Sequence, residues 1–245
     1  MSSERAATSA DIEQTLVRLV ADVSAAAGTD LGGIVLYGGL AKHRYTPGIS
    51  DINVLIVVHS TSYAVLERLA DVLTMARRRD RVAALVVTLP ELHRFAALFP
   101  VKVADIQATH RLLAGTIDLA DITIDPRLLH LRAAQESANR ALRARQILLE
   151  HRSDPNALWG ALVNELPGLA VTLETVLRAR GDDVPEDRAD VMRAGADALG
   201  LRVTIEPFAG LHRHLARPAD HDVRLAFAAW LELLDRIALA VDDLK

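Results

Sequence analysis

The stretch between residues 31 and 58 constrains the fold of this chain more than any other part of the sequence. It contains two apolar runs, Ile34–Tyr37 and Val54–Val58, which are rich in β-branched residues and bounded by turn-forming residues. Such runs are typical of buried β-strands. Gly38 and Gly39 directly follow the first run. The stretch therefore predicts a strand, a glycine turn, a loop and a second strand.

Polar residues stand at the start of the second strand, where an apolar residue would be expected. Asp51 and Asn53 are two positions apart, and because side chains alternate along a strand, both should point to the same face. A carboxylate is costly to bury unless it is paired or bound to a metal. Lys42 lies in the loop between the two strands. The pattern therefore predicts a polar site that combines an acid, an amide and a basic loop.

This pattern resembles the signature of the polymerase-β-like nucleotidyltransferase superfamily. That signature is a strand, a Gly-Ser turn, a loop that often carries Arg or Lys, and Asp-x-Asp on the next strand. Gly38 matches the first glycine, and Gly39 stands where the serine is expected. Lys42 takes the basic position of the loop, Asp51 the first aspartate and Asn53 the second. The resemblance implies that the chain has the fold of this superfamily.

The resemblance also implies a role for these residues. The acidic pair of the family holds Mg²⁺ (or Mn²⁺), which bridges the triphosphate of a nucleotide co-substrate. A third carboxylate, from a later and adjacent strand, holds a second ion or takes the proton of the attacking hydroxyl. Our candidate is Asp105, at the end of a strand that we predict over residues 101–105. The implied metal ligands are Asp51, Asn53 and Asp105, and the implied nucleotide-binding residues are Gly38, Gly39, Lys42 and Ser50.

Two positions depart from the family's pattern. Asn53 keeps an oxygen ligand but brings no charge, so the set of Asp51, Asn53 and Asp105 carries two formal negative charges. Gly39 keeps its backbone N–H but lacks the serine hydroxyl. Two functions are therefore open. The first is Mg²⁺-dependent transfer of a nucleoside monophosphate from an NTP to a hydroxyl of a small molecule or protein. The alternative is a catalytically degenerate member that binds a nucleotide or a partner protein, as a regulatory or antitoxin-like module.

The rest of the sequence predicts two domains. Residues 1–125 read as an α/β (α+β) domain with a small mixed sheet that helices cover on one face. The helices predicted there span residues 9–27, 61–79 and 90–98, and a further strand spans 82–87. Residues 126–245 read as an all-α helical bundle. The predicted helices of the bundle span 126–152, 155–180 and 185–199, with a short one after Pro207 and a last one from about Asp220.

The second domain resembles the helical domains of aminoglycoside-type nucleotidyltransferases in architecture. In those proteins a carboxylate of the bundle can act as a base. Glu136, Glu165 and Glu174 are candidates by their position in the sequence alone.

Composition restricts the partners and the location of the protein. A net charge of -4 gives no general attraction to long nucleic acids, so we expect no extended nucleic-acid partner. The chain has no cysteine, which excludes disulfides and thiolate metal sites. The N-terminus lacks the apolar core of a signal peptide, and no apolar run approaches the ~20 residues of a membrane span. We therefore expect a cytoplasmic protein without membrane contact, and the sequence leaves open whether it is a homodimer.

Overall fold

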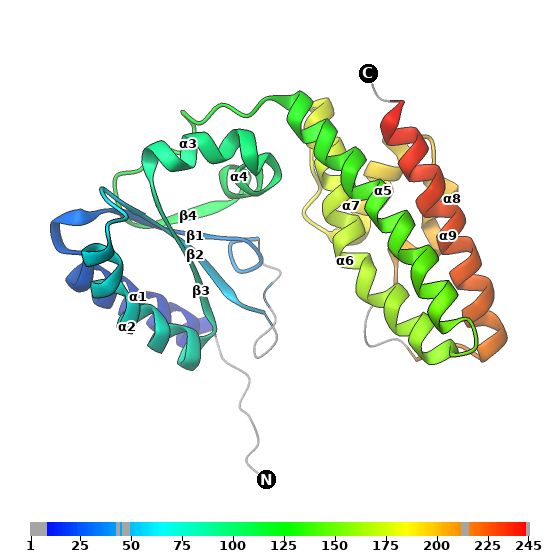
Figure 1. The fold of residues 1–245 in the computed structure, drawn as a ribbon, viewed down its shortest axis with the longest axis horizontal. Coiled ribbons are helices and arrows are strands. Elements are labelled where there is room, and N and C mark those ends of the chain that lie inside the picture. Colours follow the sequence, from blue (N-terminus) through cyan, green and yellow to red (C-terminus); the bar gives the residue numbers. More distant parts are fainter. Residues whose placement is uncertain (1–8, 43–44, 46–49, 212–215, 244–245) are drawn as a thin grey trace, which may run out of the picture. The chain divides into compact units, whose positions relative to one another are not determined.

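Four strands form one mixed sheet in the first half of the chain (Figure 1). They are β1 (Leu31–Tyr37), β2 (Ile52–Val58), β3 (Val82–Thr88) and β4 (His110–Gly115), in the order β3-β2-β1-β4. β1 is antiparallel to β2 and β4, whereas β2 and β3 are parallel. This arrangement confirms the small mixed sheet that the sequence predicts. The protein is seen here in a computed structural model, which describes residues 9–42, 45, 50–211 and 216–243.

Helices cover both faces of this sheet. The helices are α1 (Ser9–Ala27), α2 (Tyr63–Asp80), α3 (Leu89–Leu98) and α4 (Pro100–Ala108). α1 and α2 pack on the face that presents Ile34 and Ile56, whereas α3 and α4 pack on the face that presents Val35 and Leu55. The prediction of helices on one face is wrong. Both sets of alternating residues on the central strands are apolar, so each face needs a covering layer.

The segment after Phe99 is the helix α4, so the strand predicted over residues 101–105 is wrong. The alternating valines Val101 and Val103 imitate a strand pattern. Pro100 stands in the first turn of the helix, where its missing N–H has no intrahelical partner to lose. The buried residues of α4 are Pro100, Val103, Ala104 and Ile106. The fourth strand of the sheet is instead β4, which follows α4. Its first three residues are exposed at the edge of the sheet, so no alternation of apolar residues marks this strand in the sequence.

The second half of the chain is helical throughout its described elements. The helices are α5 (Pro126–His151), α6 (Pro155–Arg180), α7 (Arg188–Ala198), α8 (Arg202–Ala209) and α9 (Asp220–Asp242). Asp125 caps α5 by accepting a hydrogen bond from the backbone N–H of Arg127 at 2.9 Å. α6 ends at Gly181, whose φ of 77° is the left-handed conformation of a helix C-terminus. Both ends were predicted from the sequence.

The contacts divide the chain into two compact units, Met1–Ile124 and Asp125–Lys245, which we describe separately. In the second unit Phe208 and Trp230 are buried and meet edge to face, with ring centroids 5.1 Å apart. Pro207 lies inside α8, so the helix predicted after this proline is wrong. Residues 212–215, which that helix would have included, lie outside the described residues. Among the described helices, none is both long and apolar enough to cross a membrane.

Candidate functional site

The residues of the glycine-turn motif lie at one end of the sheet in the first unit. β1 ends there at Tyr37, and the other three strands begin there. Tyr37 pairs with Asn53 of β2 on one side and with His110 of β4 on the other. Ile52 of β2 pairs with Val82 of β3. This end of the sheet therefore gathers the loop that follows β1 and the starts of three strands.

The glycine turn brings Gly38 and Asn53 together. Gly38 has a φ of 76°, a conformation that glycine adopts at little cost. The backbone N–H of Lys42 donates to the Gly38 carbonyl oxygen at 3.0 Å, which closes the turn. A Cβ added to Gly38 would lie 3.0 Å from Nδ2 of Asn53. The turn thus approaches the start of β2 closely because residue 38 has no side chain. Gly39 lies within this turn, and Ser50 lies at the bend before β2.

A second cluster joins the turn to helix α4. The Lys42 ammonium pairs with Asp105 of α4 and is largely buried, with its side chain 14% exposed. Lys102, three residues before Asp105, places its ammonium 4.7 Å from the centre of the Tyr37 ring. Sequence reasoning missed Lys102 because the segment reads as a strand. The available signal was its rarity, since the chain has lysine at only three positions.

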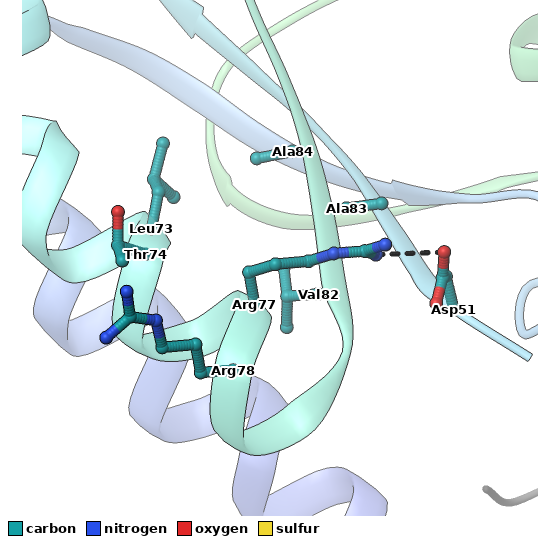
Figure 2. A pocket seen from close by; sticks show the side chains of 8 residues that line it. All are labelled: Asp51, Leu73, Thr74, Arg77, Arg78, Val82, Ala83 and Ala84. Atoms are coloured by element: carbon teal, nitrogen blue, oxygen red, sulfur yellow. Dashed lines mark ion pairs between the residues drawn. The ribbon is translucent and has the colours of Figure 1, made fainter.

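Asp51 lies apart from these contacts and pairs with two arginines. Arg77, near the end of α2, places Nη1 2.9 Å from Oδ2, and Arg81 places Nη2 3.0 Å from Oδ1. Figure 2 shows the Arg77 side chain reaching past the start of β3 to the carboxylate. Oδ1 is buried, and the Arg81 contact is an ion pair that lacks hydrogen-bond geometry. Arg77 begins the basic run 77–79 in the last turn of α2. From the sequence we predict a solvated helix end there, with a phosphate or nucleic-acid patch as the alternative; the structure turns Arg77 toward Asp51.

Asp51 and Arg77 line a pocket at the edge strand β3 (Figure 2). Its volume is about 490 Å³. The lining residues are Asp51, Leu73, Thr74, Arg77, Arg78, Val82, Ala83 and Ala84. Asp51 is the only acid among them, so the lining is basic, with two guanidinium groups against one carboxylate.

The two arginines keep Asp51 ionised. The hydrogen bond from Arg77 lowers the pKa of Asp51 below its ordinary value of 3.8; burial acts in the opposite direction, and the charges of Arg77 and Arg81 add to the lowering. A carboxyl whose pKa is lower in the folded state stabilises the fold above its unfolded pKa. That contribution is lost as the pH falls through the folded pKa.

We therefore expect the Asp51→Asn variant to lose stability at neutral pH, and the loss to disappear in acid. The difference in the free energy of unfolding between native protein and variant should be constant above about pH 5 and should shrink below about pH 4. Urea unfolding across this pH range measures it. A difference that does not change with pH would show that the ion pairs contribute nothing to stability.

The carboxylates at this end of the sheet are each paired with cations. Asp51 is paired with two guanidinium groups and Asp105 with Lys42. β3 and β4, the two other strands that begin at this end, contain no Asp or Glu, and Ala83 stands opposite Asn53. No group of three or more His, Asp or Glu side chains that could hold a metal occurs among the described residues. A divalent ion on Asp51 would be repelled by the adjacent arginines.

Two of the three candidate bases of the second unit have structural partners. Glu165 accepts a hydrogen bond from Arg140 at 2.5 Å. Glu174 is buried and accepts from Arg178, one helical turn away, at 2.6 Å. Glu136 is exposed on α5. Nothing in the geometry of the second unit itself marks one of the three as a base.

The mixed sheet, the glycine turn at the end of β1 and the acid at the start of β2 define the first unit as a nucleotidyltransferase fold, followed by a helical region. Comparisons with known proteins agree at this level. No family model and no curated protein matches the chain. Among solved structures it is similar to spectinomycin adenyltransferase AAD(9) from Enterococcus faecialis, determined with ATP and spectinomycin. The TM-score is 0.50 at 13% identity, over 91% of this chain and 98% of that chain. This likeness confirms the predicted fold; it says nothing about activity.

Proposed function

We propose that this protein is a catalytically degenerate member of the nucleotidyltransferase fold, which binds a nucleoside triphosphate without transferring part of it. One observation carries the proposal: each carboxylate of the motif is already paired with a cation. Asp51 is held by two arginines and Asp105 by Lys42. Asn53 supplies an amide where the resemblance calls for a second acid. Such a site presents cations that can bind phosphate, while its two acids are already engaged by those cations and its third polar group is uncharged.

The charge at this end of the sheet supports triphosphate as the ligand. Among the described residues, the cations at the two clusters are Lys42, Lys102, Arg77, Arg78 and Arg81, and the carboxylates paired with them are Asp51 and Asp105. Arginine and lysine hydrogen bonds to phosphate are charge-assisted and strong. A glycine turn adds backbone N–H groups that can point at an anion. The ATP bound in the similar adenyltransferase structure supports the same ligand class. The nucleotide would then regulate the protein or its association with a partner.

The second candidate is the Mg²⁺-dependent transfer of a nucleoside monophosphate to a hydroxyl of a small molecule or protein. It is favoured by the ionised state of Asp51, which stands at the position of the family's first aspartate. In this version Asp51 and Asn53 hold Mg²⁺ or Mn²⁺, and Asp105 is the third ligand or the base. Asp51 must then exchange its arginines for the ion.

Nucleotide binding should persist in EDTA and should weaken about five- to tenfold in Lys42→Ala, because the variant loses a charge-assisted phosphate contact. Calorimetric titration with each NTP, in EDTA and in Mg²⁺, measures it. Arg68→Ala is the matched control: Arg68 also pairs with an aspartate, Asp30, which precedes β1 at the opposite end of the sheet. Equal affinities in all three proteins would contradict the assigned phosphate site.

Incubation with Mn²⁺ or Mg²⁺ and α-labelled NTPs, alone and with cell extract, separates the two candidates. We expect neither labelled product nor pyrophosphate from the native protein. Either of them would establish transfer and overturn the degenerate reading.

A further inference from the structure

A narrow apolar line runs along the exposed face of helix α5, between the exposed polar residues Gln135 and Arg145. Leu131, Leu142 and Leu149 are 60%, 54% and 79% exposed, and Ala138 is exposed between them. We call these four residues the outer stripe. Their spacings of seven, four and seven residues place them on one side of a helix with 3.6 residues per turn. The buried residues of α5 lie on the other side: Leu129, Ala133, Ser137, Ala141 and Ala144.

We propose that the outer stripe is the interface of a homodimer, in which the α5 helices of two copies pack antiparallel about a twofold axis. The spacings of the stripe, seven, four and seven residues, are the same when they are read from either end. With the axis beside Arg140, Leu131 lies against Leu149 of the second copy, and Ala138 lies against Leu142 of the second copy. A twofold interface must be complementary to itself in this way. Spacings of seven and four are also the seam of paired helices.

The charges along one flank of the stripe also favour a second copy of the chain, packed antiparallel, as the partner. Arg132 and Glu150 lie 18 residues apart, which is five helical turns, and therefore on one flank of α5. In the antiparallel pair Arg132 faces Glu150 of the second copy, and the contact occurs twice. Arg132 now donates to Gln135 at 2.7 Å, and the Glu150 side chain is 72% exposed. Glu150 also lies 3.8 Å from Nε2 of His151, so a pair across the seam would replace these exposed contacts.

The dimer should be weak and should depend on concentration. The stripe runs over the 19 residues 131–149, which is roughly 27 Å of helix. A single helix face of this length buries less surface than the interface of a permanent dimer. On the other flank Arg127 and Arg152 of opposite copies approach each other, and their repulsion lowers the affinity. The exposed leucines of α9 do not form a comparable seam, because Glu232, Asp235 and Arg236 lie between Leu225 and Leu239.

Sedimentation equilibrium over a wide range of concentration tests the interface. We expect the native chain to show a monomer–dimer equilibrium and Leu142→Glu to remain monomeric. The matched control is Leu239→Glu, which introduces the same charge at a leucine that is 69% exposed on α9 and should dimerise like the native chain. A native chain that is monomeric at every concentration would overturn the proposal. So would dimers of the same affinity in Leu142→Glu.

A charge exchange tests the antiparallel direction. Arg132→Glu and Glu150→Arg should each weaken the dimer several-fold, because each places like charges opposite one another twice. The double variant restores both pairs and should recover most of the native affinity. If the double variant is as weak as the single ones, the twofold antiparallel pairing is wrong. Far-ultraviolet circular dichroism of each variant verifies that the helices are intact.

Discussion

Replacing Asn53 by aspartate is expected to raise the affinity of this end of the sheet for Mg²⁺ by roughly 30- to 100-fold. The change adds a full negative charge beside Gly38, at the position where the resemblance calls for a second acid. Two carboxylates, from Asp51 and residue 53, would then balance the charge of the two arginines. The Asn53 side chain lies close to Gly38, and aspartate has nearly the same size, so the fold should tolerate the exchange.

Calorimetric titration with Mg²⁺, with and without a nucleotide, measures this effect. Asn164→Asp is the control, because it makes the same substitution at an exposed position of α6 and should leave Mg²⁺ affinity unchanged. Release of pyrophosphate by Asn53→Asp alone would indicate a pocket that lost catalysis through this one residue. An unchanged affinity in Asn53→Asp would contradict the placement of the metal position at residue 53.

Replacing Trp230 by alanine is expected to lower the free energy of unfolding of the helical unit by about 3–5 kcal/mol. Its side chain is 1% exposed and packs edge to face on Phe208. The variant loses this apolar contact and leaves a cavity that the surrounding helices fill only in part. Denaturant unfolding, followed by the fluorescence of the remaining Trp159, measures the change in the second unit.

Leu239→Ala is the comparison for this effect, since Leu239 lies on the same helix and is 69% exposed. It should change the free energy of unfolding by at most about 0.5 kcal/mol. A loss below about 1 kcal/mol in Trp230→Ala would mean that the unit does not depend on this aromatic pair.

Local rules were enough for the ends of most helices. Asp125 and Asp154 each precede a proline and cap α5 and α6, and Gly181 ends α6 with a positive φ. These features depend on the hydrogen bonds of a few neighbouring backbone groups, so they are present in the sequence itself. The same is true of Gly38, which directly follows an apolar strand.

Local rules failed where the environment decides between two conformations. The valines of the segment 101–105 alternate as in a strand, yet the segment is the helix α4, because Val103 and Ile106 are buried together on one helical face. β4 is a strand because its backbone pairs with β1, at an edge where its first three residues stay exposed. Neither outcome depends on the segment alone.

The sequence by itself determined that a glycine turn joins two buried strands, that Asp51 and Asn53 open the second strand, and that a helical region follows. Those features depend on periodicity and on turn chemistry, which act over a few residues. Only the tertiary structure decided which cations meet the acids. Arg77 and Arg81 reach Asp51 because β3 pairs in parallel with β2, and Lys42 meets Asp105 across 63 residues of chain. Charge pairing acts through space, so no pattern along the chain could reveal it.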